Sequence, residues 1–244
     1  MIPKKIHYIW LGGKSKSKFS ESCLLTWKDK NPEFEIIEWN EKNLDLEAIA
    51  LKNKFFSECM KRKLYAFMAD YLRIKILYEH GGIYIDTDVQ AIKPIDELAL
   101  KNDELLGYEA YNNLGTGVIG ACKNNYFIKQ VLDFYDNEIM DSKAYVIPEV
   151  MTIVLERIKK QGKRINVFPM EYFSPYNYTE TFQDKCITPN TYTIHWFDGT
   201  WVENKQVCVF LQTKHIKNPV KKKLVQGKKI LGYYYRKGLK KNAK

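Results

Sequence analysis

The chain is organised around one stretch, Gly81-Gly82-Ile83-Tyr84-Ile85-Asp86-Thr87-Asp88. Two glycines are typical of the end of a helix, and the apolar residues after them predict a short buried strand over Ile83–Asp86. Residues i and i+2 of an extended segment point the same way, so we expect Asp86 and Asp88 to converge. Paired carboxylates suit Mg²⁺ or Mn²⁺. A turn or helix cap made by two short acids is the structural alternative.

The segment before this stretch predicts a helix over Leu64–His80. Within it, Asp70 and Arg73 are three residues apart and share one face. The small side chains of Ala66 and Ala69 beside them would let a ligand approach closely. A plain ion pair within the helix explains the same two charges, so it is the combination with the D-x-D stretch that indicates a binding site.

Strand and helix patterns alternate along the rest of the chain. This alternation predicts one α/β domain over residues 1–203, with a mostly parallel sheet flanked by helices. Ligands bind at the carboxyl ends of strands in such sheets. The expected strands are Lys4–Leu11, Phe34–Trp39, Ile83–Asp86, Glu104–Glu109, Thr116–Ala121, Ile165–Phe168 and Thr191–Trp196; the expected helices are Ser20–Lys30, Asp45–Asn53, Lys54–Arg62, Leu64–His80, Asn125–Asn137 and Pro148–Gln161.

The charge is unevenly placed. The net charge is +10, but residues 1–203 hold 26 Lys or Arg against 29 Asp or Glu, while residues 204–244 hold 13 Lys or Arg and no acid. A near-neutral body argues against a nucleic-acid-binding protein. The five scattered cysteines read as reduced thiols, and Met1–Trp10 lacks the apolar region of a secretory signal. We therefore expect a cytoplasmic protein.

The tail, residues 204–244, mixes lysines with apolar and aromatic residues such as Leu231 and Tyr233–Tyr235. Such a segment suits the anionic inner face of the plasma membrane, where it would hold the protein peripherally. A solvated basic helix with a frayed end explains the same composition.

Four ordered motifs together resemble glycosyltransferase family 32, the enzymes with a D-x-D sugar-binding region. That family includes initiating mannosyltransferase-like enzymes of yeast and bacterial capsule transferases. The motifs also resemble the catalytic core of the large clostridial glucosylating toxins. Besides Ala66–Arg73 with Gly81–Asp88, the matching segments are Ile2–Gly13, Gly115–Ala121 and His195–Trp201.

The resemblance implies a GT-A fold, a Rossmann-like sheet that binds a nucleotide, and a Mn²⁺ or Mg²⁺ ion. Asp88 would bind the metal and Asp86 the metal or the sugar. His195, which stands where the toxins have a carboxylate, would be a third ligand or a diphosphate contact. The other implied substrate-binding residues are Trp10 against the donor base, His7 on the same strand, Asp70 and Arg73 on the sugar, and Thr200 and Trp201 over the phosphates. Asn113 could line the acceptor side, although loop polarity alone explains it.

The sequence thus predicts a retaining hexosyltransferase that uses a UDP-sugar, with Asp86 and Asp88 as the catalytic pair. Its expected acceptor is a glycan or lipid-linked oligosaccharide of bacterial surface polysaccharide. Two other classes of protein share single features of this sequence. A haloacid-dehalogenase-type phosphatase continues D-x-D-x-[TV], but Gln90 occupies the last position here. A nucleic-acid-binding protein would bind through the basic tail, but this sequence contains no known nucleic-acid-binding motif.

Overall fold

The structure is a computed structural model that describes residues 1–199 and 209–242. The strands are β1 Lys5–Ile9, β2 Glu35–Trp39, β3 Gly82–Ile85, β4 Val89–Ala91, β5 Glu104–Leu105, β6 Tyr108–Ala110, β7 Asn113–Leu114, β8 Val118–Ala121 and β9 Thr193–His195. The helices are α1 Lys18–Lys30, α2 Leu46–Lys52, α3 Lys54–Lys61, α4 Tyr65–His80, α5 Asp96–Lys101, α6 Tyr126–Asn137, α7 Ile147–Lys160 and α8 Pro219–Asn242, with short 3-10 turns at Met170–Tyr172 and Asp184–Cys186.

The central sheet has five strands in the order β2-β1-β3-β8-β5. β1 pairs in parallel with both β2 and β3, and β8 pairs antiparallel with β3 and β5, so β8 alone runs against the other four strands. The sheet is therefore mainly parallel, as the sequence predicts. The inner strands β3 and β8 are buried along their whole length.

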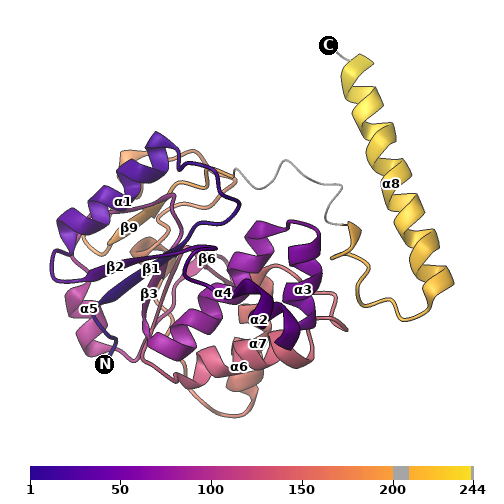
Figure 1. The fold of residues 1–244 in the computed structure, drawn as a ribbon. Helices are drawn as coiled ribbons and strands as arrows, with labels where there is room; N and C mark the ends of the chain where they lie inside the picture. Colours follow the sequence, from indigo (N-terminus) through magenta and orange to yellow (C-terminus); the bar gives the residue numbers. More distant parts are fainter. Residues whose placement is uncertain (200–208, 243–244) are drawn as a thin grey trace.

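Helices cover both faces of this sheet (Figure 1). Alternate residues of β3 pack into the two hydrophobic cores on opposite faces of the sheet, because neighbouring side chains of a strand point to opposite faces. Tyr84 packs in the larger core with α3, α4, α6 and α7. Ile83 and Ile85 pack in the second core, where Trp27 of α1 is fully buried. Both cores are apolar, and together they fix the strand end from which the D-x-D motif leaves the sheet.

Two glycines end α4 as the sequence predicts. Gly81 has a φ of 64° and Gly82 a φ of 106°, in the region that favours glycine. A Cβ atom at Gly82 would lie 2.7 Å from Nε2 of His7, so this position also needs a residue without a side chain. The glycine pair thus lets the chain turn from α4 directly into the sheet.

Several expectations about elements need correction. No strand forms over Ile165–Phe168; only one parallel bridge joins Gly107 to Phe168. The expected strand Glu104–Glu109 is divided between β5 and β6. The structure also contains α5, β4 and β7, which the sequence does not predict. The strands β4 and β7, of three and two residues, are too short to show a hydrophobic period.

Within the described part of the tail, residues 210–214 pack on the body, and α8 projects from it (Figure 1). Leu211 is fully buried in the larger core. The ammonium of Lys214 donates to the backbone carbonyls of Ile139, Ser142 and Ala144, the last two at 2.6 and 2.8 Å. Within the described residues, no helix is both long enough and apolar enough to cross a bilayer.

Candidate active site

The D-x-D motif lies on a tight turn between β3 and β4, not in the extended segment that the sequence predicts. The amide of Asp86 donates to the carbonyl oxygen of Gly117 at 2.8 Å, which holds the start of the turn against β8. The amide of Val89 then donates to the carbonyl oxygen of Asp86 at 3.1 Å and closes the turn. The two carboxylates still converge, but the turn brings them together rather than strand alternation.

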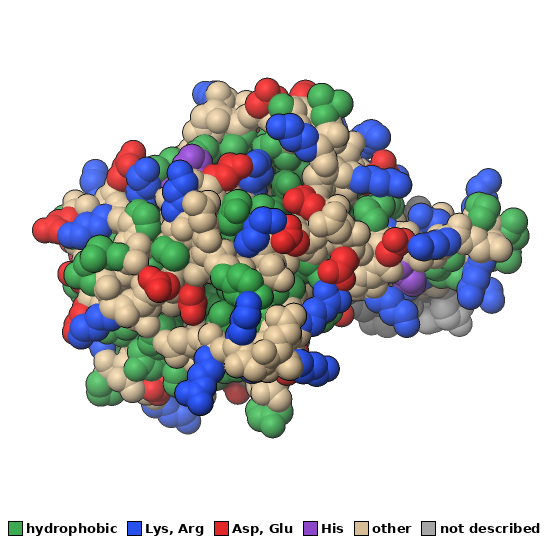
Figure 2. All heavy atoms as spheres, turned by 90° about the horizontal axis from the view of Figure 1, so that it is seen from below, with side chains coloured by type: hydrophobic (Ala, Val, Ile, Leu, Met, Phe, Trp, Pro, Cys, Tyr) green, Lys and Arg blue, Asp and Glu red, His purple; other side chains and the backbone are tan. Residues whose placement is uncertain are grey.

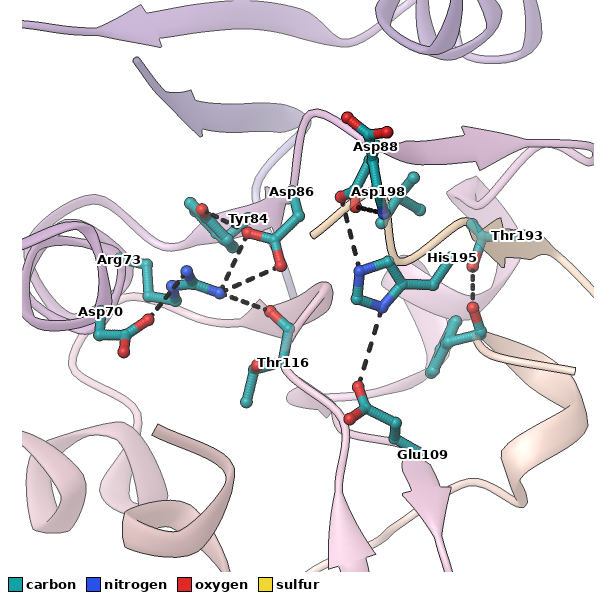
Figure 3. Close-up of polar contacts among 12 residues, drawn as sticks. Asp70, Arg73, Tyr84, Asp86, Asp88, Glu109, Thr116, Thr193, His195 and Asp198 are labelled. Carbon is teal, nitrogen blue, oxygen red and sulfur yellow. Dashed lines mark hydrogen bonds and ion pairs between the residues drawn. The ribbon is translucent and has the colours of Figure 1, made fainter. Parts of the chain in front are cut away.

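Three candidate metal ligands meet at this turn (Figure 3). One ligand atom from each of Asp86, Asp88 and His195 lies within 4.8 Å of the other two. His195 comes from β9, which pairs antiparallel with β4 so that His195 stands opposite Val89. The grouping of both aspartates with His195 agrees with the metal set expected from the sequence.

Asp88 is held from two sides. Its Oδ1 lies 3.5 Å from Nε2 of His195, and its Oδ2 accepts from the backbone amide of Asp198 at 3.0 Å. Burial alone would raise the pKa of Asp88, but the contacts to His195 and the Asp198 amide outweigh it and lower that pKa. Asp88 is thus an ionised carboxylate, the form that binds a metal ion.

Glu109 on β6 is the residue of this site that the sequence analysis did not find. Its Oε2 lies 3.8 Å from Nδ1 of His195, a buried nitrogen that has no hydrogen-bond partner. Burial raises the pKa of Glu109 while His195 opposes that rise. Carboxylates beside the outer nitrogen of a metal-binding histidine commonly orient its ring. Glu109 is in position to do this for His195.

Glycines leave the space that these side chains need. A Cβ atom at Gly117 would lie 2.8 Å from Nδ1 of His195, and one at Gly115 would lie 3.1 Å from Cβ of Glu109. The run Gly115-Thr116-Gly117 was singled out from the sequence as a motif, and this crowding is the physical reason for its small residues.

Arg73 is buried and is the centre of a second network, which includes Asp86 (Figure 3). Its Nη2 bonds Oδ1 of Asp70 at 3.0 Å, and its Nη1 lies 3.2 Å from Oδ1 of Asp86 and donates to the carbonyl oxygen of Thr116 at 2.9 Å. The guanidinium also lies over the ring of Tyr84, 4.4 Å from its centroid. Asp70 and Arg73 thus form the ion pair within the helix that is the structural alternative from the sequence, and Arg73 links this pair to the D-x-D turn. Binding of the donor sugar by these two residues stays a prediction.

The charges of this network are set by burial and by one another. Burial raises the pKa of Asp70 to about 7, against the lowering effect of Arg73. Burial would lower the pKa of Arg73, but the charges of Asp86, Tyr84 and Asp70 raise it above its usual range. The hydroxyl of Tyr84 donates to Oδ1 of Asp86 at 2.8 Å. Asp86 is thus held by a cation and a hydroxyl before any ligand arrives.

The two residues expected on the first strand have different surroundings. Trp10 lies just beyond β1, is partly exposed, and its indole nitrogen donates to the carbonyl oxygen of Lys14 at 2.5 Å. His7 is fully buried. Its Nε2 bonds the carbonyl oxygen of Gly81 at 2.8 Å, and its Nδ1 accepts from Nε1 of Trp39 at 3.1 Å. Both ring nitrogens of His7 are therefore engaged inside the protein, which gives the ring a structural role.

The remaining predicted residues lie further along the chain. Asn113 stands on β7, partly exposed, and its Oδ1 accepts from the hydroxyl of Thr152 at 3.4 Å. Thr200 and Trp201 lie outside the residues that the structure describes, as does the domain limit expected at residue 203.

Comparisons with known proteins agree with this site. Residues 19–105, which contain Asp70, Arg73 and the D-x-D turn, match the family model for the glycosyltransferase sugar-binding region containing a DXD motif. The chain is 25% identical to the "Uncharacterized glycosyltransferase L373" of Acanthamoeba polyphaga mimivirus, over 88% of this chain and 90% of that protein. It is 30% identical to the initiation-specific alpha-1,6-mannosyltransferase of Candida albicans over 48% of this chain, which spans 32% of that enzyme.

Among solved structures, the PaToxG glycosyltransferase is similar, with a TM-score of 0.52 and 21% identity over 64% of this chain and 69% of that chain. This likeness concerns the fold alone and agrees with the GT-A architecture expected from the sequence. The family match covers the helix and the turn that carry Arg73 and the two aspartates. Residues 19–105 are therefore similar to the sugar-binding region of the glycosyltransferases that contain a DXD motif.

Proposed function

We propose that this protein transfers a sugar from a nucleotide-sugar donor, with a divalent metal ion held by Asp86, Asp88 and His195. One observation carries the proposal: three potential ligand atoms from these residues lie within 4.8 Å of one another. The cationic Arg73 touches one of them at 3.2 Å. This arrangement would place a metal ion and a fixed cation where the diphosphate of a donor would have to bind.

The chemistry of the ligand set fits a divalent ion. Carboxylate oxygens suit Mg²⁺ and Mn²⁺, and the histidine nitrogen favours Mn²⁺ of the two. The unpartnered Nδ1 of His195 is buried toward Glu109, so the other nitrogen, Nε2, is the one directed to Asp88. When bound, the ion would neutralise the negative charge that develops on the departing nucleoside diphosphate.

The chain's own residues would position the donor. Both terminal nitrogens of Arg73 are already bonded to Asp70, Asp86 and Thr116. We therefore assign Arg73 a positioning role: it fixes the two carboxylates, whose remaining lone pairs would accept hydrogen bonds from sugar hydroxyls. Trp10 keeps part of its ring exposed at the end of β1, where it would stack on the nucleotide base.

The finer parts of the proposal rest on the resemblance of the motifs. We propose UDP as the nucleotide, retention of the anomeric configuration, and a glycan or lipid-linked acceptor in the assembly of bacterial surface polysaccharide. Retention would proceed by front-face substitution, in which the departing phosphate assists the incoming hydroxyl. The chemistry needs charge stabilisation on an oxocarbenium-like centre, which the carboxylates of Asp70 and Asp86 would supply.

Calorimetric titration of UDP and GDP, with Mn²⁺ and with EDTA, tests the donor site. We expect binding of one nucleotide that requires the metal and is lost in Asp88→Asn. Asp29→Asn, which changes an exposed aspartate on α1, is the matched control and should bind like the wild type. Absence of binding by both nucleotides under both conditions would overturn the proposal. Incubation of radiolabelled UDP-sugars with Mn²⁺ then identifies the sugar from slow donor hydrolysis.

A further inference from the structure

The helix α8 carries a strong positive charge and has few contacts with the body. Residues 204–244 contain 13 Lys or Arg and no Asp or Glu. Two described hydrogen bonds from its side chains go to the tail segment before the helix: Gln226 donates to the hydroxyl of Thr213 at 3.0 Å, and Lys229 donates to Oε1 of Gln212 at 2.8 Å. Because Gln226 and Lys229 are three residues apart, one face of α8 is turned toward the segment that Lys214 anchors to the body.

The opposite face of α8 is apolar and exposed. Leu224 precedes Gln226 by two residues and Leu231 follows Lys229 by two, and two residues turn a helix by roughly 200°. Leu224 and Leu231 are 62% and 71% exposed, and Val220, one turn before Leu224, is 67% exposed. These three side chains therefore form a stripe that points away from the body.

Lysines surround this stripe. Lys221, Lys223 and Lys228 are exposed on the same two turns of α8. At the root of the helix, an open hollow of about 430 Å³ is lined by Lys143 of the body and by residues 215–218 and 221. Figure 2 shows the result: Lys and Arg side chains gather with hydrophobic ones on the projecting part, where acids are sparse, whereas both signs mix on the body.

We propose that α8 binds the surface of an anionic lipid bilayer, with Val220, Leu224 and Leu231 inserted between the headgroups. The stripe would enter the boundary between headgroups and acyl chains, and the flanking lysines would pair with lipid phosphates. The hollow beside Lys143 would accept one such phosphate. In a cell, the surface of this description is the cytoplasmic leaflet of the plasma membrane.

Charge and apolar contact together indicate which partner this face of α8 binds. A second copy of the chain would bring a second unbroken set of positive charges against the first, which repel each other. A nucleic acid would satisfy the lysines but would leave three apolar side chains in water, whereas an anionic bilayer satisfies both. The inference does not depend on which donor the active site uses.

Co-sedimentation of the full chain with vesicles tests the proposal. We expect binding to phosphatidylcholine vesicles that contain phosphatidylglycerol and little binding to phosphatidylcholine alone. The double variant Leu224→Asp/Leu231→Asp should reduce the partition coefficient at least about tenfold, and so should Lys221→Glu/Lys223→Glu/Lys228→Glu, because each near-surface lysine contributes about fivefold. Leu51→Asp, which changes an 89% exposed leucine on α2, is the matched control and should bind like the wild type.

Metal-dependent nucleotide binding is the control for folding and is measured on the same preparations. We expect it to be unchanged in every variant. Equal binding to neutral and anionic vesicles would overturn the proposal, and so would wild-type binding by the double leucine variant. Strong, salt-sensitive binding to RNA without binding to vesicles would assign α8 to nucleic acid instead. A truncation for this purpose belongs after Asn218, because a cut at Lys214 would remove the anchor on the body.

Discussion

Gly117 and His195 occupy one small space: a Cβ atom added at Gly117 would lie 2.8 Å from Nδ1 of the His195 ring. No positive φ is involved at Gly117, so the backbone itself would accept alanine. The ring of His195 also lies 4.0 Å, centroid to centroid, from the ring of Phe197. His195 is thus fixed between a glycine and an aromatic ring, and the candidate metal site depends on that fit.

Gly117→Ala should therefore weaken metal binding. The added methyl group would push the His195 ring away from Asp88, and we expect Mn²⁺ affinity to fall about tenfold or more, as it does when the surroundings of a metal ligand are changed. Titration calorimetry of Mn²⁺ measures the effect. Gly227→Ala on α8, where a methyl group meets nothing within 4 Å, is the control. Unchanged Mn²⁺ affinity would mean that His195 is not a ligand.

Glu109→Gln should loosen His195 without removing a potential ligand. Glutamine keeps the shape of Glu109 but loses the charge that lies 3.8 Å from Nδ1 of His195. We expect a loss of about 10-fold to 100-fold in Mn²⁺ affinity and a lower pKa of His195, visible by proton NMR of the metal-free protein. Glu156→Gln, on the exposed side of α7, should change neither quantity.

Arg73→Met should destabilise the protein strongly. The buried carboxylate of Asp70 and the half-buried carboxylate of Asp86 would lose their shared cation, and removing one partner of a buried ion pair costs about 3–5 kcal/mol. Urea denaturation measures the change in the free energy of unfolding. The control is Arg157→Met, which breaks an exposed pair with Glu138 at 2.8 Å and should cost less than about 1 kcal/mol. A similar loss in the free energy of unfolding for both variants would show that Arg73 does not stabilise the buried network.

His7 should make the fold sensitive to acid. Burial lowers the pKa of His7 to about 4, from 6.5 in an unfolded chain. Between pH 6.5 and pH 4, His7 is protonated in the unfolded chain but neutral in the folded protein. The free energy of unfolding is therefore unaffected by protonation of His7 above pH 6.5 and decreases as the pH falls toward 4. His7→Gln keeps a donor for Gly81 but does not titrate. Between pH 7 and 4.5 the variant should lose about 2 kcal/mol less stability than the wild type. Parallel pH profiles would argue against this role.

The sequence was sufficient for the parts of the fold that local patterns control. The α4 helix and its glycine end follow from an apolar run closed by Gly81, and the Asp70–Arg73 pair follows from helical spacing. These features depend on residues close together in the chain, where hydrogen-bond geometry and backbone preference act directly.

What the sequence did not reveal depends on contacts between distant segments. The pairing of β4 with β9 involves three residues on each side, too few for a periodic pattern, yet it brings His195 to the D-x-D turn. Glu109 lies 86 residues before His195, and only the fold brings its Oε2 to 3.8 Å from Nδ1 of that histidine. His7, expected near the substrate, is instead tied to Gly81, because a strand residue can meet the end of a helix that precedes the neighbouring strand.

The position of the D-x-D turn links metal binding to folding of the whole body. More than 100 residues of chain lie between Asp88 and His195, so the unfolded chain does not hold the two side chains together, and an ion would bind both of them only in the folded form. An ion bound only to the folded form stabilises it in proportion to the logarithm of its concentration. The melting temperature should then report on free Mn²⁺, and a nascent chain would gain this protection only after β9 has been synthesised.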